Sequence, residues 1–194
     1  AELRAAAAHW VARLAERRRL EPTDERRSTV RSQVSPLLND DDPDARLAAA
    51  TALAAWNLLT PEVGEAVLQL LRHPAAQPTS LVAAAQLVPR FPELANEAVP
   101  QLAALLSAEQ AELRESAAQA LLRLQTLSAP AAPALVAALE DEEPLVRECA
   151  ARTLGLFPFC DDSMLQGLQQ ATGDEDPEVA AAARASIARL DELR

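Results

Sequence analysis

The chain has 194 residues, of which 49% are hydrophobic and only 3% aromatic. Alanine and leucine, which cost least in a helix interior, are abundant and the residues that favour strands are scarce, so the composition predicts an all-α fold. The formal net charge is −11 and all 18 basic residues are arginines. This excess of acids argues against nucleic acid as a partner, because such binding depends on many cation–phosphate contacts.

No apolar run approaches the roughly 18 to 20 residues that a membrane-spanning helix needs, so we expect no membrane partner. No signal peptide is visible in the first residues. The two cysteines, Cys149 and Cys160, are too few for a disulfide framework, which predicts a reducing, cytoplasmic location. The sequence starts at Ala1 rather than at a methionine, and we therefore expect it to be a piece of a longer protein.

The sequence repeats itself at intervals of 33 to 35 residues. The similar segments DDPDARLAAATALAAW, EEPLVRECAARTLGLF and EDPEVAAAARASIARL begin at positions 41, 142 and 175. One anchor position recurs in every repeat, and it is occupied by Pro43, Pro78, Ala111, Pro144 and Pro177. Small or apolar residues follow each anchor after six, ten and thirteen positions, a spacing that places them on one face of a helix.

Each repeat is predicted to form a helical hairpin, with a first helix (helix A), a short acidic turn, and a second helix (helix B) that begins at the anchor. The acids before the anchor would cap helix B and interact favourably with its dipole. All elements are expected to form a single domain over residues 1–194. In chain order they are an unpaired B helix at 1–20 and hairpins at 23–58, 61–92, 94–125, 130–157 and 161–194.

The repeat anchored at Pro78 departs from the others. Its turn, HPAAQPTSL, contains no acid, and Leu81 stands where an arginine is expected. Pro89 lies inside the predicted B helix, where it removes a backbone hydrogen bond, so this helix should be kinked or shortened. Two interpretations stay open for this region: simple divergence of one repeat, and a functional hinge.

The segments LLNDDDPDARLAAATAL, ALEDEEPLVRECAARTL and ATGDEDPEVAAAARASI resemble HEAT repeats, and most closely the short bacterial type first associated with phycobilisome lyases. The resemblance covers essentially the whole chain. It implies a right-handed α-α superhelix, a solenoid of five helical hairpins plus an N-terminal half repeat. It also implies a ladder between neighbouring repeats, formed by an Asp of each turn and an Arg of helix B. The matching residues are Asp40, Asp141 and Asp174, with Arg46, Arg114 and Arg147.

No set of residues predicts catalysis, a cofactor or a metal site. The histidines His9 and His73 are isolated, and the His-Glu pairs of iron-binding HEAT proteins such as deoxyhypusine hydroxylase do not occur. Cys149 takes a position that holds Ala or Ser in the other repeats, and we interpret it as a buried packing thiol. A HEAT-like DNA glycosylase would line its groove with basic and aromatic residues, whereas this chain has two tryptophans and an acidic body.

The B helices are expected to line the concave face, where such solenoids usually bind their partners. Positions four, eight and twelve after each anchor point to that face. Their mixture of arginine, glutamine and apolar residues suits a protein partner with acidic and apolar features. The alternative is an ordinary solvated surface, since Glu148 and Arg152 have the spacing of a simple helical pair. The predicted partner-binding residues are Arg13, Leu47, Val82, Gln86, Arg90, Gln119, Arg123, Arg152 and Arg189.

These features favour a protein–protein interaction scaffold or adaptor without enzymatic activity. The repeat subtype leaves open a bilin lyase-like chaperone for chromophores, although no residue can be assigned to holding a tetrapyrrole. A third alternative is a structural repeat segment of a larger multidomain regulatory protein. Strong visible absorbance after mixing with a bilin would favour the second function, and failure to capture any partner would favour the third.

Overall fold

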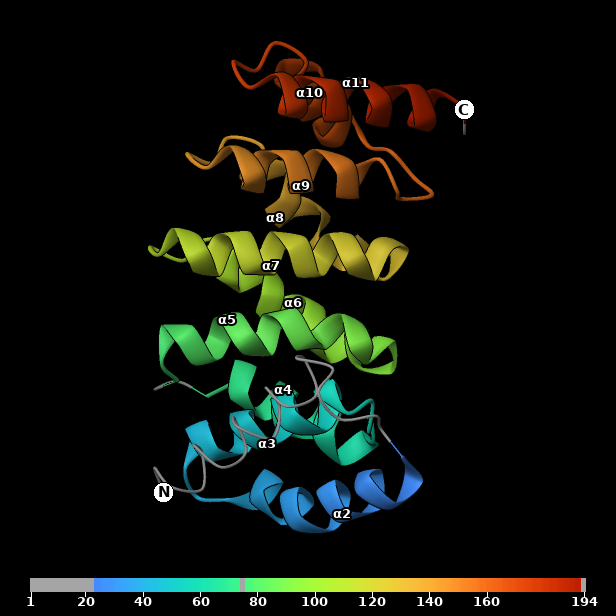
Figure 1. The fold of residues 1–194 in the computed structure, drawn as a ribbon. Coiled ribbons are helices and arrows are strands. Elements are labelled where there is room, and N and C mark those ends of the chain that lie inside the picture. Colours follow the sequence, from blue (N-terminus) through green and yellow to red (C-terminus); the bar gives the residue numbers. More distant parts are fainter. Residues whose placement is uncertain (1–22, 74–75, 193–194) are drawn as a thin grey trace. The chain divides into compact units, whose positions relative to one another are not determined.

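A computed structural model describes residues 23–73 and 76–192 (Figure 1). Within these ranges all regular secondary structure is helical, which confirms the predicted all-α fold of helical hairpins. The chain divides into two compact units, residues 1–94 and 95–194, and each is described by itself. The half repeat predicted at 1–20 lies outside the described residues, and the single domain over the whole chain stays a prediction.

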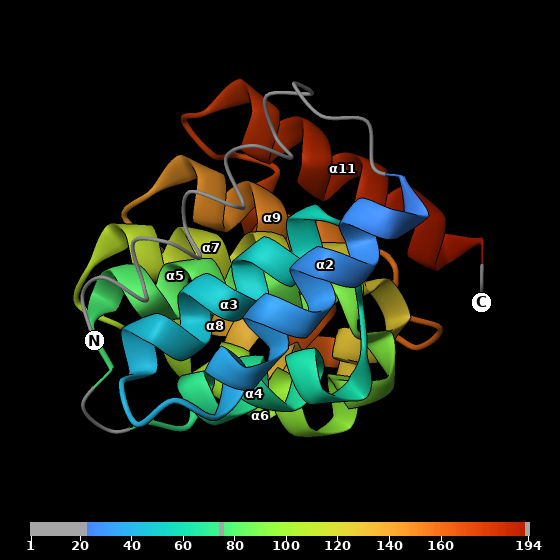
Figure 2. The same cartoon turned by 60° about the horizontal axis from the view of Figure 1, so that its bottom comes forward.

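The described part of the first unit contains two helical hairpins. The first pairs α2 and a 3₁₀ helix with α3, and the second pairs α4 with α5, which two 3₁₀ turns follow. Figure 2 views this unit from its α2 end, with α3 and α5 neighbouring each other in one layer. The elements are α2 (Asp24–Val34), η1 (Ser35–Asn39), α3 (Pro43–Ala55), α4 (Pro61–Leu71), α5 (Pro78–Leu87), η2 (Val88–Arg90) and η3 (Pro92–Leu94).

The second unit contains three hairpins, each with an A helix and a B helix. The B helices α7, α9 and α11 pack in sequence within one layer, while α6, α8 and α10 form the other layer (Figure 1). The elements are α6 (Ala95–Leu105), α7 (Ala111–Leu124), η4 (Gln125–Ala131), α8 (Ala132–Ala138), α9 (Pro144–Leu154), α10 (Asp162–Ala171) and α11 (Pro177–Asp191).

Every described B helix begins at its predicted anchor, and in four of the five a proline occupies the first helical position. Acidic side chains cap two of these starts. The Asp42 carboxylate accepts the N–H of Asp44 at the start of α3, and Asp176 accepts the N–H groups of Glu178 and Val179 at the start of α11. The prediction that the acidic turns cap helix B is confirmed for these two helices.

The core of each unit lies between its two helical layers, and the predicted inner face of helix B supplies much of it. The alanines six positions after the anchors are fully buried, and their small size lets neighbouring helices approach closely. Ile187, which is half-buried, is the exception among the larger residues. The buried residues at these positions are Ala49, Leu53 and Trp56; Ala84, Val88 and Phe91; Ala117, Leu121 and Leu124; Ala150, Leu154 and Phe157; and Ala183 and Leu190.

The B helix that contains Pro89 is shortened, as predicted. Its α-helical part ends at Leu87, and Val88–Arg90 continues as a 3₁₀ turn. Pro89 has no N–H to donate, and its ring would clash with the carbonyl four residues earlier, so regular α-helical bonding ends before it. The hinge interpretation of this region stays a prediction.

Candidate functional site

An Asp–Arg ladder links the hairpins of the second unit. The guanidinium of Arg147 on α9 donates from Nε and Nη2 to the two carboxylate oxygens of Asp174, both at 2.8 Å. Arg114 on α7 binds Asp141 in the same bidentate way, at 2.7 and 3.1 Å. The rungs that the family resemblance implies for these four residues are therefore present.

Each of these arginines also holds the turn that precedes its own helix. Nη1 of Arg147 donates to the backbone carbonyls of Asp141 and Glu142 at 2.9 and 3.1 Å. The side chains of Arg147 and Asp174 are only 9% and 11% exposed. The guanidinium lowers the pKa of the Asp174 carboxyl, and the carboxylate raises the pKa of Arg147, because each stabilises the charged form of the other. Residues engaged in this way are structural and leave little capacity for a partner.

In the first unit, Arg46 binds its own turn in the same way, but no carboxylate among the described residues pairs with it. Its Nη1 donates to the carbonyls of Asp40 and Asp41 at 2.7 and 3.3 Å. The position equivalent to Asp141 and Asp174 in the next repeat is Ala75. Nε of Arg46 is buried and has no hydrogen-bond partner among the described residues. The ladder implied by the resemblance is thus open at this rung.

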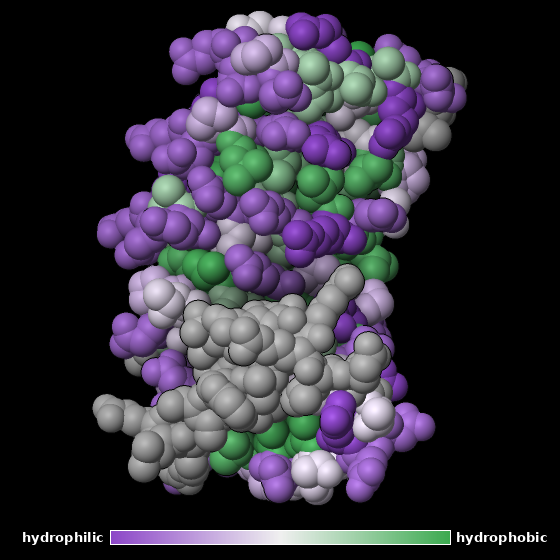
Figure 3. Space-filling view, in the orientation of Figure 1, coloured by the Kyte–Doolittle hydropathy of each residue, from purple (hydrophilic) through white to green (hydrophobic). Residues whose placement is uncertain are grey.

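The B helices of the second unit together form a groove of about 610 Å³, which we call the B-helix groove. Three of the predicted partner-binding residues, Arg123 on α7, Arg152 on α9 and Arg189 on α11, line it. Over this layer, hydrophobic side chains lie among hydrophilic ones (Figure 3). The full lining is Leu122, Arg123, Gln125, Glu148, Arg152, Leu156, Glu178, Ala181, Ala182, Ala185, Ser186 and Arg189.

The three groove arginines differ in how they are engaged. Nη1 of Arg152 donates to Oε1 of Glu148 at 2.9 Å, in an exposed pair one helical turn apart. Within the described residues, Arg123 and Arg189 make no hydrogen bond or ion pair, and both are exposed. These two cations are therefore available to a ligand, whereas the charge of Arg152 is already balanced.

The groove has a local charge opposite to that of the unit that contains it. Residues 95–194 carry 17 acids and 7 arginines, a formal net charge of −10. The groove lining has three arginines against two acids, Glu148 and Glu178, a net of +1. Glu178 lies in the first turn of α11 and Arg189 in its last turn, so the two opposite charges are separated along the helix.

The other predicted partner-binding residues do not join this groove. Gln119 lies on α7 and is half-buried, outside the lining. In the first unit, Leu47 and Val82 are half-buried and Gln86 is exposed. Arg13 lies outside the described residues.

Arg90 of the first unit has a structural engagement that the sequence did not indicate. Its Nη1 donates to the carbonyl of Ala54 at 2.6 Å, and its Nη2 donates to Oδ1 of Asn57 at 3.1 Å. Asn57 has a positive φ of 56°, just after α3 ends. Arg90 therefore fastens the irregular end of α3, and its substitution would disturb folding as well as any binding.

Several residues of the groove were not among those predicted from the sequence. Leu122 and Ser186 lie one position away from the predicted positions twelve and eight, because the groove surface is wider than a single row on each helix. A broader stripe of about 100° on helix B would have included them. Gln125 follows the end of α7, and a helical pattern gives no signal for it.

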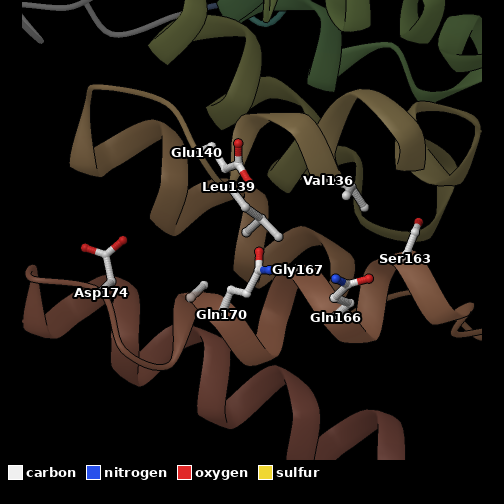
Figure 4. A pocket seen from close by; sticks show the side chains of 9 residues that line it. Val136, Leu139, Glu140, Ser163, Gln166, Gly167, Gln170 and Asp174 are labelled. Carbon is white, nitrogen blue, oxygen red and sulfur yellow. The ribbon is translucent and has the colours of Figure 1, made fainter.

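A second hollow, of about 480 Å³, lies between the A helices α8 and α10 (Figure 4). Val136 of α8 and Leu139, just after α8, face Gln166 and Gln170 of α10 across it. Gly167 permits this approach, since a Cβ there would lie 2.8 Å from Cδ1 of Leu139. No sequence motif predicted this hollow, which depends on how two different helices meet.

Cys149 is buried in α9, in agreement with a packing role. Burial raises the pKa of its thiol to about 11, so the reactive thiolate is scarcely populated at neutral pH. In the described part of the chain, no group of three or more His, Cys, Asp or Glu side chains is placed to hold a metal ion. None of the described helices is both long and apolar enough to cross a membrane.

Comparison with known proteins agrees with this architecture. Residues 99–188, which lie within the second unit, match the family model of HEAT repeats. No match was found among curated proteins. The prediction of HEAT-type repeats is therefore confirmed over residues 99–188, while the narrower likeness to the phycobilisome-lyase type stays a prediction.

Several solved structures with similar folds are engineered proteins. A designed armadillo repeat protein in complex with the peptide (KR)4 has a TM-score of 0.72 and 16% identity, over 95% of this chain and 92% of that chain. Two engineered proteins have TM-scores of 0.70 and 0.68, each with 19% identity. The first match covers 99% of this chain and 93% of the other, and the second covers 97% and 90%. At these identities the likeness shows the fold alone.

Proposed function

We propose that this chain is a protein-binding scaffold and that its second unit holds the partner in the B-helix groove. HEAT and armadillo-like repeats generally mediate protein binding. The observation that carries the proposal is the meeting of Arg123, Arg152 and Arg189 in one groove. They come from three different repeats, together with apolar Leu122 and Leu156.

The composition of the groove indicates the character of the partner. Arginine beside apolar surface is typical of the energetically important part of protein interfaces. Two of the arginines have no partner within the described residues, and a ligand carboxylate would find charge-assisted hydrogen bonds there. The designed armadillo protein is in complex with a basic peptide, whereas we propose a ligand of the opposite charge for this chain.

Affinity capture with two charge-matched double variants tests the proposal. Arg123→Gln with Arg189→Gln removes the two free cations of the groove, while Gln166→Glu with Gln170→Glu adds two acids to the hollow between α8 and α10. Both changes lower the net charge by the same amount. The captured partner should be lost with the first variant and retained with the second. Equal loss with both variants, or retention with both, would contradict the assignment of the groove.

A further inference from the structure

The B-helix groove contains a row of residues at one register. Position twelve after the anchor is occupied by Arg123 on α7, Leu156 just after α9, and Arg189 on α11. All three line the groove. Because α9 packs against both α7 and α11, the row runs across the helices, in the order cation, apolar residue, cation.

The middle of the row is apolar and carries no unbalanced charge, whereas an arginine without an ionic partner among the described residues lies at each end. Leu156 is half-buried and offers apolar surface between the two arginines. Arg152, the remaining cation in the groove, is held by Glu148 one turn earlier on the same helix. Ala181 and Ala185 on α11 also line the groove, and their small side chains do not project far into it. A ligand that crosses the row therefore meets two unbalanced positive charges separated by an apolar contact.

The distance between the two end arginines follows from helix packing. Packed helices lie about 8–10 Å apart, so α7 and α11 are separated by about 16–20 Å through α9. An extended peptide rises by about 3.3 Å per residue. Two carboxylates of one extended segment would reach both arginines if about five or six positions separated them.

We propose that the B-helix groove recognises an extended peptide segment with two acidic residues about six positions apart and an apolar residue roughly two or four positions after the first, so that all three side chains point to the same side. This inference rests on the proposed function and specifies its ligand. The segment crosses the C-terminal parts of the three B helices, with its acids on Arg123 and Arg189 and its apolar side chain on Leu156. A continuous acidic run is a poorer ligand, because its central charges meet Leu156 and the balanced Glu148–Arg152 pair.

Synthetic peptides of identical composition test the spacing. The matched peptide has two Glu residues about six positions apart, with a Leu roughly two positions after the first Glu and Ser elsewhere, so that the Leu lies on the same side as both Glu residues. Its isomer has both Glu residues next to the Leu. Fluorescence anisotropy with labelled peptides measures the dissociation constants on the full chain. We expect the matched peptide to bind about tenfold more tightly than the isomer, because it gains one additional charge-assisted contact.

Single variants then locate the two contacts. Arg123→Gln and Arg189→Gln should each weaken binding of the matched peptide to the level of the isomer, and each should leave the isomer nearly unchanged. Gln166→Glu, in the other hollow, is the control and should change neither affinity. Circular dichroism checks that every variant stays folded, as expected for exposed side chains without hydrogen bonds.

The outcomes separate this inference from the proposed function. If both isomers bind equally well and both lose affinity in the groove variants, the groove binds acidic peptides but the spacing rule is wrong. If neither peptide binds the wild-type chain, the spacing rule is also overturned. The affinity capture with the two charge-matched double variants then tests independently whether the groove binds a protein partner.

Discussion

The two units join their neighbouring hairpins by different means. In the second unit, Arg114 and Arg147 each make a buried bidentate pair with an Asp of the following turn. In the first unit, the Ser80 hydroxyl donates to the Asp44 carboxylate at 2.9 Å, and Arg90 donates to the end of α3. The same repeat frame thus accepts either a recurring ionic joint or a set of local polar contacts.

The difference begins with a few residue types in the sequence. Ala75 and Ala108 stand at positions where the ladder repeats have Asp, and Leu81 stands where they have Arg. Between Arg46 and Arg114, the ladder positions therefore contain neither the Asp nor the Arg. This stretch contains the division between the two units after Leu94.

The largest effect is expected from breaking a buried rung. Arg147→Met should lower the free energy of unfolding of the second unit by about 3–5 kcal/mol, because Asp174 would keep a buried charge without its partner. Arg152→Met on the same helix is the matched control, since its pair with Glu148 is exposed and such pairs contribute about 0–1 kcal/mol. Urea denaturation, with hydrogen exchange to locate the change, measures both. Similar losses in the two variants would refute the distinction.

A somewhat smaller effect is expected where Gly155, at the end of α9, packs closely against Ser186 of α11. A Cβ at Gly155 would lie 2.8 Å from the Cα of Ser186, whose hydroxyl donates to the carbonyl of Ala151 at 2.8 Å. Gly155→Ala should therefore destabilise the second unit by about 2–3 kcal/mol through overpacking. Gly173→Ala is the control, because a Cβ there meets only an ordinary contact at 3.6 Å. Thermal unfolding of both variants would reveal the contrast, and equal melting temperatures would count against it.

Restoring the missing acid should strengthen the first unit. The repeat register places Ala75 at the acidic position of the ladder, and Arg46 has a buried Nε without a partner among the described residues. Ala75→Asp should raise the free energy of unfolding by about 1.5–3 kcal/mol, the contribution of hydrogen bonds to a charged group. Ala76→Asp, one position out of register, should give no gain.

A double-mutant cycle identifies the source of that gain. In an Arg46→Met background, Ala75→Asp should no longer stabilise the chain, because the proposed pair cannot form. If the gain persists in this background, a general charge effect is responsible and the open-rung interpretation fails.

The smallest effect is a dependence on pH. The pKa of Asp174 is lowered by Arg147, so its stabilisation is complete above the unfolded value of about 3.9 and is lost as the pH falls through the lower folded value. The stability difference between the wild type and Asp174→Asn should therefore shrink from about pH 6 to about pH 2. Glu175→Gln, at the exposed neighbouring position, is the control. A difference that stays constant with pH would contradict the role of the ionised rung.

Much of the fold could be predicted because the repeat fixes a helical period. The alanine six positions after each anchor and the large residue thirteen positions after it are buried as expected, since both belong to one helical face. The same period predicted that Arg123 and Arg189 share a row, because equivalent residues of packed repeats lie at equivalent places.

Other parts of the candidate site could not be predicted from a period. The bonds of Arg90 depend on the early end of α5 before Pro89, which moves the residue out of the regular helix. The hollow between α8 and α10 depends on the approach that Gly167 permits. These features come from contacts between elements that are distant in the sequence, and one repeat compared with another does not show them.

The way in which the ladder arginines bind has an evolutionary consequence. Arg147 holds its own turn through Nη1 and the next turn through Nε and Nη2, so each rung is shared between two successive repeats. A tandem duplication of the repeat anchored at Pro144 would carry one Arg and one Asp and would close its own new rung. Duplication of the repeat anchored at Pro78 would add neither partner. Lengthening of this chain by gene duplication is therefore physically favoured on the C-terminal side and disfavoured in the middle.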